Sequence, residues 1–218
     1  MAVDEWVERL AKLDTCAVSD AQDKLGIKGT ITGILPLYPT GRIAGRAVTV
    51  RLKTKGNEEA TVHLGTTAVG AADAGDVIVI DHRGRTDVAG WGGILSTAAA
   101  TKGFAGVIID GASRDVDEAQ GLGLPLFARA ATPPTARGRI VEEFTNEPIE
   151  IGGVAVRPGD YVIADNSGVV IVPWDRAEEV VPEAERIVAR ETAMAQDVKN
   201  GKPVAEVMGI SYEQMLTR

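Results

Sequence analysis

The chain has 218 residues, 44% of them hydrophobic, which allows one compact domain with a substantial core or two small ones. Its formal net charge of -8 at pH 7 argues against a broad basic face that holds nucleic-acid phosphates or anionic lipid. Apolar runs are far shorter than the roughly 20 residues that span a bilayer. We therefore expect neither a nucleic-acid nor a membrane partner.

The N-terminus and the cysteine content indicate the compartment. The first residues have the period of an amphipathic helix and lack the basic start and apolar block of a signal peptide. Cys16 is the single cysteine, so no internal disulfide can form, which fits a reducing environment. The sequence predicts a soluble, cytoplasmic protein.

Two helices are predicted at the start of the chain. Val7, Leu10 and Leu13 mark one face of the first helix. Ser19 is the expected cap of a second, short helix that ends at Gly26. We expect both helices to pack outside the core.

The centre of the chain repeats a short pattern, a Gly-Asp turn, four largely apolar residues and an Asp, over residues 75–81 and again over 159–165. Residues 106–111 form a buried type of strand that ends in Asp, and 168–173 form another. Further predicted elements are a helix over residues 57–72 and strands over 47–52, 126–130, 138–142 and 150–156. The loop over 34–41 connects the N-terminal helices to this part.

Strands with and without intervening helices predict an α/β fold with two sheet layers and helices on one side, a three-layer β/β/α sandwich with N- and C-terminal helices. A helix is expected over residues 176–199 and a last short one over 203–208. No low-complexity linker divides the sequence. We expect one domain over residues 1–218, with its core at about 18–175.

Several common catalytic motifs are absent from the sequence. It has no P-loop, no Cys/His zinc cluster and no Gly-x-Ser-x-Gly elbow. Its two histidines, His63 and His82, limit histidine-based catalysis. Lys102 lies at an expected helix end, where a cation is favourable without any catalytic role.

The segment from Trp91 to Asp115 carries the best candidate chemistry. Gly92 and Gly93 precede a helix over residues 94–102, whose first N–H groups are suited to a carboxylate. The strand that follows leads to Arg114 and Asp115. An anion site, a guanidinium and a carboxylate on neighbouring loops could bind a 2-keto acid beside a metal. A surface ion pair explains Arg114 and Asp115 about equally well.

Residues 90–96, 106–118 and 158–173 resemble the RraA-like family, and the likeness extends from about Val18 to Glu191. The family includes aldolases for 4-hydroxy-4-methyl-2-oxoglutarate and 4-carboxy-4-hydroxy-2-oxoadipate, which also decarboxylate oxaloacetate, and regulators of ribonuclease E. The resemblance implies a swivelling-domain-like fold and a class II, metal-dependent lyase.

The resemblance also implies residue roles. Asp115 would hold Mg²⁺ or Mn²⁺, and Arg114 would bind the keto oxygen of the substrate and stabilise the enolate. Glu118 would complete an Arg-Asp-x-x-acid pattern. The substrate carboxylate would lie on the segment Gly92, Gly93, Ile94, Leu95 and Ser96, on the N–H groups of its last three residues.

One position departs from the family. The aldolases carry an acidic residue where this chain has Gly93, and loss of that acid affects metal affinity and proton transfer. Asp87, Asp110 or His82 are candidates to compensate, although His82 is also compatible with a solvated loop.

Residues 81–87 form a polar run of the sequence. Arg83 and Arg85 could contact a second substrate carboxylate, or the run could be an ordinary charged surface loop.

The C-terminal helix places Glu191 on a stripe of apolar residues at helical spacing: Val180, Ala184, Ile187, Met194 and Val198. A carboxylate is costly there unless paired or bound. By resemblance, Glu191 is the candidate for a glutamate that approaches the metal of a neighbouring subunit; pairing with Arg186 or Arg190 is the alternative. The family implies a homotrimer or a pair of trimers, with this helix at the interface.

We expect a metal-dependent carbon–carbon lyase that acts on a small 2-keto acid, by retro-aldol cleavage to pyruvate, by oxaloacetate decarboxylation, or by both. Two alternatives remain at this level. One is a regulatory, ribonuclease E inhibitor-like protein without catalysis. The other is a lyase or dehydratase acting on another hydroxy acid or a sugar acid.

Overall fold

The computed structural model describes residues 4–57 and 63–209. In this part of the chain, one hydrogen-bonded path of strands runs in the order β1-β11-β10-β3-β4-β5-β6-β2, and β7 also pairs with β3. The strands are β1 (Thr30–Ile31), β2 (Leu35–Pro36), β3 (Ile43–Thr54), β4 (Val77–Ala89), β5 (Gly106–Ser113), β6 (Leu126–Ala131), β7 (Ile140–Thr145), β10 (Tyr161–Asp165) and β11 (Gly168–Val172). A separate hairpin contains β8 (Ile149–Ile151) and β9 (Val154–Val156).

The long strand β3 belongs to two sheets. Its first residues pair antiparallel with β10, which continues to β11 and β1. Its later residues pair parallel with β4 and antiparallel with β7, and β4, β5 and β6 form a parallel series. The mixed α/β class expected from the sequence is confirmed.

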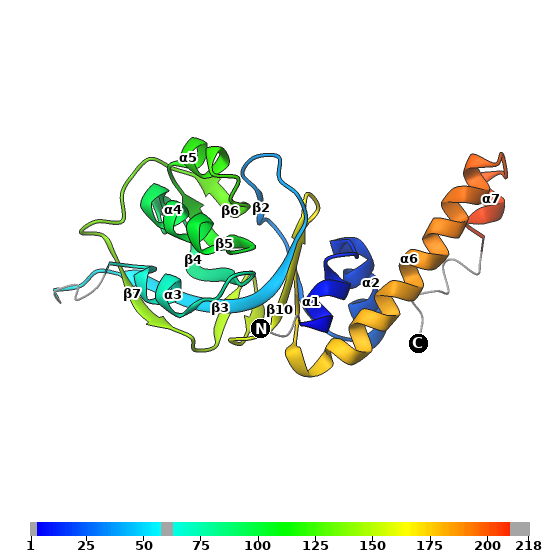
Figure 1. Cartoon of the computed structure of the whole chain (residues 1–218), viewed down its shortest axis with the longest axis horizontal. Helices are drawn as coiled ribbons and strands as arrows, with labels where there is room; N and C mark the ends of the chain where they lie inside the picture. Colours follow the sequence, from blue (N-terminus) through cyan, green and yellow to red (C-terminus); the bar gives the residue numbers. More distant parts are fainter. Residues whose placement is uncertain (1–3, 58–62, 210–218) are drawn as a thin grey trace.

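Helices cover the outer faces of both sheets (Figure 1): α1 (Glu5–Leu10), α2 (Thr15–Leu25), α3 (Thr66–Ala71), α4 (Gly93–Lys102), α5 (Val116–Gly121), α6 (Ala177–Lys199) and α7 (Val204–Val207), with a 3-10 turn η1 (Trp174–Arg176) before α6. Helices α3, α4 and α5 lie over the parallel series, and α1, α2 and α6 lie over the antiparallel sheet. Helices α3, α4 and α5 and the two sheets form the expected β/β/α layers. Helices α1, α2 and α6 form an additional outer layer on the antiparallel sheet.

The layers follow from the two-residue period of the strands. On β4, Ile78 and Ile80 pack in the helix-facing cluster, while Val77 and Val79 pack between the two sheets. These side chains are essentially fully buried. Burial of an aliphatic side chain of this size contributes about 1.5–3 kcal/mol. The site-bearing helices α4 and α5 therefore rest on a rigid sheet.

Both copies of the Gly-Asp pattern lead into neighbours of β3. Gly75 and Gly159 have positive φ, 88° and 84°, and start the turns before β4 and β10. Strand β4 then pairs with residues 47–51 of β3, and β10 with residues 43–46. The repeated turn thus precedes the two strands that flank β3, one in each sheet.

Three local predictions were wrong. Asp14 rather than Ser19 caps α2, because its side chain accepts from the Ala17 N–H and the helix begins at Thr15. Of the helix expected over 57–72, only α3 is helical among the described residues, and Gly65 with φ 79° precedes it; residues 58–62 lie outside the described part. The strand expected over 150–156 is a hairpin that turns at residues 152–153 with positive φ.

The acidic residues expected at strand ends stabilise the fold, but only Asp165 ends its strand, because Asp81 and Asp110 lie inside β4 and β5. Buried Asp81 accepts from Arg51 at 2.7 Å, and buried Asp110 accepts from Arg129 and from a backbone N–H of the β8–β9 turn. Asp165 accepts from the backbone and hydroxyl of the first residue of α2 at 2.9 and 2.7 Å.

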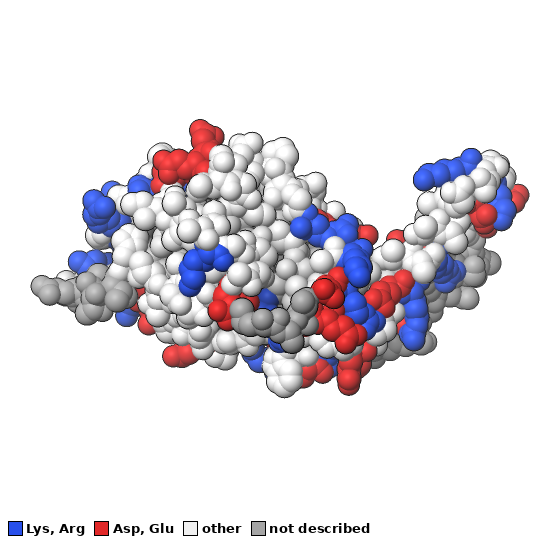
Figure 2. All heavy atoms as spheres, viewed as in Figure 1, with Lys and Arg blue, Asp and Glu red and all other residues white. Residues whose placement is uncertain are grey.

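Helix α6 continues beyond the body of the molecule and carries α7 at its end (Figure 1). None of the helices in the described residues has both the length and the apolar character needed to cross a membrane. On the face drawn in Figure 2, acidic side chains gather over α5, and the described Lys and Arg side chains are scattered or mixed with acidic ones.

Candidate active site

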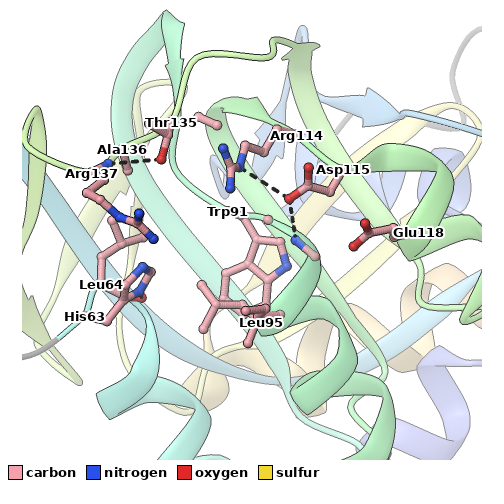
Figure 3. Close-up of a pocket in the computed structure, with 14 residues that line it drawn as sticks. His63, Leu64, Trp91, Leu95, Arg114, Asp115, Glu118, Thr135, Ala136 and Arg137 are labelled. Carbon is pink, nitrogen blue, oxygen red and sulfur yellow. Dashed lines mark hydrogen bonds and ion pairs between the residues drawn. The ribbon is translucent and has the colours of Figure 1, made fainter.

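A pocket of about 340 Å³ opens where the start of α4, the turn between β5 and α5, and the connection between β6 and β7 meet (Figure 3). It contains most of the residues singled out in the sequence and several that were not. One wall is formed by the segment 92–95 with Arg114, Asp115 and Glu118.

Arg114 and Asp115 lie at the centre of this wall. The Arg114 Nε lies 3.3 Å from Asp115 Oδ2, and the same oxygen accepts the Gly93 N–H at 2.8 Å. Asp115 has φ 56°, a left-handed conformation that is uncommon for a residue other than glycine. The Arg114 N–H donates to the carbonyl of Trp91 at 3.1 Å, which helps to hold this turn. The turn presents both side chains to the pocket.

The first turn of α4 provides N–H groups beside Asp115. The Ser96 N–H donates to the Gly92 carbonyl, and its hydroxyl donates to the same oxygen at 3.1 Å. Ser96 is buried and does not line the pocket, so its expected N–H contact with the substrate carboxylate is wrong. The N–H groups of Ile94 and Leu95 belong to the first turn, where an α-helix provides no acceptor of its own. Since the positive end of the helix dipole lies here, these two groups are suited to a carboxylate.

At two glycines of this loop, an added side chain would meet the side chains of the site. A Cβ at Gly92 would lie 2.9 Å from Asp115 Oδ2 and 3.2 Å from Arg114 Nε. A Cβ at Gly93 would lie 1.8 Å from Glu118 Oε2. The Glu118 carboxylate therefore occupies the space in which a side chain at position 93 would begin.

Trp91 forms the floor of the pocket and fixes the start of α4. Its side chain is 2% exposed and packs in the helix-facing core, and its Nε1–H donates to the Ser96 hydroxyl at 3.0 Å. The sequence analysis assigned no role to this residue. Its indole joins the core of the fold to the wall that carries Arg114 and Asp115.

The opposite wall was not anticipated from the sequence. It contains His63, Leu64, Thr135, Ala136 and Arg137 (Figure 3). These residues come from the segment before α3 and from the β6–β7 connection, so only the tertiary structure brings them to Arg114.

The residues proposed to compensate for Gly93 lie elsewhere. Asp110 pairs with Arg129, and Asp87 pairs with Arg85 on the surface. His82 lies inside β4, is 1% exposed, and does not line the pocket. Both interpretations of His82, a substitute for the missing acid at position 93 and a solvated loop residue, are wrong.

The residues expected to read a distal carboxylate also lie outside the pocket. Arg83 pairs with Glu143, and Arg85 pairs with Asp87 within β4. The polar run over 81–87 is therefore strand rather than loop.

Burial lowers the pKa of the His82 imidazole below its usual value of 6.5, although its Nε2 lies 2.8 Å from the Val88 carbonyl. As the pH falls, His82 takes up a proton in the unfolded chain before it does so in the folded protein, which favours unfolding. The free energy of unfolding is therefore unaffected by His82 above about pH 6.5 and decreases as the pH falls from there toward the folded pKa. We expect Tm to fall between about pH 7.5 and about pH 5.5, and His82→Gln to flatten that dependence. A thermal melt series checks this; His63→Gln is the control, and an unchanged slope in His82→Gln contradicts the assignment.

Glu191 lies far along α6, in a shallow groove with Met194, Val198 and Met208. Burial, with Asp20 and Asp14 nearby, raises the pKa of its carboxyl. Arg186, one of its suggested partners, pairs with Glu183 instead. Glu191 does not line the pocket of its own chain.

The donor set suits a weakly held divalent cation. Within residues 4–57 and 63–209, no three His, Cys, Asp or Glu side chains converge as metal ligands. Asp115 offers one carboxylate, of which Oδ2 is already hydrogen-bonded and Oδ1 has no partner within the described residues. Mg²⁺ commonly binds one or two carboxylates and completes its shell with water and substrate. The residues present fit such an ion.

Comparison with known proteins agrees with the fold. Residues 15–171 match the sequence model of the RraA-like family, described as Aldolase/RraA. A Halalkalibacterium halodurans protein, provisionally named a 4-hydroxy-4-methyl-2-oxoglutarate aldolase, is 34% identical over 202 residues, which cover 89% of this chain and 90% of that protein.

Two further proteins widen the comparison. DlpA of Legionella pneumophila is 28% identical over 95% of this chain, which spans 34% of that longer protein. The crystal structure of Streptomyces coelicolor RraAS2, described as an unusual member of the RNase ES inhibitor RraA protein family, is 27% identical with a TM-score of 0.82. It aligns over 90% of this chain and 99% of its own.

Proposed function

The chain belongs to the RraA-like family, and on that basis we propose that it is a divalent-metal-dependent carbon–carbon lyase that releases pyruvate from a small 2-keto acid. The substrate is a 4-hydroxy-2-oxo acid, oxaloacetate, or both. The observation that carries the proposal is the single pocket wall that joins Arg114, Asp115 and the start of α4.

The substrate carboxylate binds the N–H groups of Ile94 and Leu95, which leaves the keto oxygen near Arg114. When the C–C bond breaks, negative charge develops on that oxygen, and the Arg114 guanidinium stabilises it. Mg²⁺ or Mn²⁺ on Asp115 would polarise the same oxygen as a Lewis acid. Retro-aldol cleavage and decarboxylation place the same charge on this oxygen, so one site serves both.

Glu118, which completes the Arg-Asp-x-x-acid pattern, also takes over the task of the acid that the aldolases carry at position 93. Its carboxylate lies against Gly93, beside the Asp115 side chain, and lines the same pocket. A side chain at position 93 and the present position of the Glu118 carboxylate exclude each other. Glycine at 93 and glutamate at 118 thus act together, and the missing acid is replaced from α5. From this place Glu118 can orient water at the metal or accept a substrate proton.

The Glu118→Ala variant is expected to lower kcat/KM about 10-fold to 100-fold, the usual effect of losing a group that orients metal ligands. Adding Gly93→Asp to Glu118→Ala restores part of the activity, because the new carboxylate enters the vacated space. Pyruvate release by the two variants checks this. Equal inactivity of the double and single variants, both folded, would contradict the replacement.

We further propose one domain over the whole chain and an oligomer, a trimer or a pair of trimers, in which α6 lies at the interface. Helix α6 continues beyond the body of the molecule (Figure 1). Glu191 lies on this helix in a groove with Met194 and Val198 and does not line its own pocket. In the oligomer Glu191 approaches the metal of a neighbouring subunit. Burial, together with Asp20 and Asp14, raises the pKa of the Glu191 carboxyl, and a partner's metal ion would stabilise the charged form there.

The experiment measures pyruvate formed from 4-hydroxy-4-methyl-2-oxoglutarate and from oxaloacetate with Mg²⁺, with Mn²⁺ and after chelation. Turnover of either substrate that depends on metal supports the lyase. The likeness to RraAS2 favours one second candidate, a regulatory protein that inhibits a ribonuclease. Inhibition of ribonuclease E by a folded protein that turns over neither substrate would support that candidate instead.

A further inference from the structure

The wall opposite Arg114 carries a second cationic region. His63 and Arg137 line the pocket there, and both also line an adjoining cavity together with Lys55. The two cavities share these residues and Leu64, so they adjoin each other. The pocket itself is a cleft with Arg114 and Asp115 at one end and His63 and Arg137 at the other.

The Arg137 guanidinium has no carboxylate partner among the residues that the structure describes. By contrast, Arg114 pairs with Asp115, and Arg139 donates from its guanidinium to the Thr135 carbonyl at 2.8 Å. The backbone N–H of Arg137 is held by the Thr135 hydroxyl at 3.2 Å, which fixes the base of the side chain. Figure 3 shows Arg137 and His63 together on this wall, facing the pocket from the side opposite Arg114.

A guanidinium binds a carboxylate with two charge-assisted hydrogen bonds, which makes arginine a common anion-binding residue. A ligand held at the Arg114 end extends along the cleft toward Arg137. An anionic group at its far end meets a cation there, whereas an apolar end leaves the guanidinium unpaired.

We propose that Arg137 is a specificity-determining residue that binds the distal carboxylate of a dicarboxylic 2-keto acid, with Lys55 of the adjoining cavity adding positive charge. The inference rests on the proposed function for the orientation of the keto acid, whose first carboxylate binds at α4. It assigns to the β6–β7 connection the role of selecting dicarboxylic over monocarboxylic substrates.

The test compares 2-oxoglutarate with 2-oxopentanoate, which has the same chain length and lacks the distal carboxylate. Binding of each to the whole protein with Mg²⁺ is measured by calorimetry, so the readout is independent of turnover. The wild type is expected to bind 2-oxoglutarate at least about 10-fold more tightly, and Arg137→Gln to remove that preference while leaving 2-oxopentanoate binding unchanged.

Arg85→Gln is the matched control, because Arg85 is an arginine that pairs with Asp87 outside the pocket. It is expected to keep the full preference. Equal binding of both acids by the wild type, or equal weakening of both by Arg137→Gln, would overturn the assignment. Failure of the lyase proposal gives a different result: the protein releases no pyruvate from any substrate, while the Arg137-dependent binding preference persists.

Discussion

The Asp115→Asn variant is expected to lose at least about 100-fold in kcat for pyruvate release, the scale associated with a group that stabilises transition-state charge. Asparagine keeps the size of the side chain and can still accept the Gly93 N–H that Asp115 now accepts. It also tolerates the left-handed backbone at this position, where φ is 56°. The variant therefore removes the charge that would hold the metal and leaves the turn intact.

Arg114→Ala is expected to cause a loss of similar size, because the developing charge on the keto oxygen then has no guanidinium beside it. Asp117→Asn is the control, since Asp117 is an exposed residue of the same helix α5 that does not line the pocket. Full activity in either Asp115→Asn or Arg114→Ala would contradict the proposed site. Circular dichroism and size-exclusion chromatography verify that each variant keeps its fold and assembly.

The Trp91→Ala variant is expected to lower the free energy of unfolding by about 3–5 kcal/mol, the usual cost of removing a large buried aromatic side chain. Trp91 is 2% exposed in the core beneath α4, and it donates to Ser96. The substitution leaves a cavity and removes the support of the first turn of α4. Activity falls as well, since that turn carries the N–H groups of the site.

Urea denaturation at a fixed protein concentration measures this effect, because the stability of an oligomer depends on concentration. Trp174→Ala is the control: this tryptophan is 53% exposed. It is expected to change stability by less than about 1 kcal/mol. Ser96→Ala removes the hydrogen bond alone and is expected to cost about 1 kcal/mol. A similar cost for the two tryptophans would show that Trp91 does not support the fold as described.

The sequence predicted the inner strands well because their hydrophobic runs are local. Residues 77–81 and 106–111 are strands in the structure, and they extend further than expected. The second half of β4 was interpreted as a loop because Arg83, Arg85 and Asp87 make it charged and it has no alternating apolar residues. Pairing with β5, as between Arg85 and Gly111, keeps this polar segment in the sheet. Such tertiary pairing is not visible in local composition.

The site divides in the same way. Gly92, Gly93, Arg114 and Asp115 lie on one α4–β5–α5 unit, so their proximity follows from short-range connectivity and could be expected from the sequence. Arg137 comes from a distant connection and has no motif. No sequence signal we used could have placed it in the pocket.

The contact between Glu118 and the space beside Gly93 is visible only in the three-dimensional structure. The sequence identified a missing acid at position 93, and the structure places the Glu118 carboxylate within 1.8 Å of a Cβ built there. A glutamate three positions after Arg-Asp is compatible with many surface helices. Only the direction of its side chain relates it to the glycine.

The most direct test of the account is pyruvate release from oxaloacetate by the intact protein, first after chelation and then after Mg²⁺ is added back, for the wild type and for Asp115→Asn. The account predicts no release above the protein-free rate after chelation, recovery with Mg²⁺ in the wild type, and no recovery in Asp115→Asn. Equal release by both proteins, or release that chelation leaves unchanged, would contradict a metal-dependent lyase centred on Asp115.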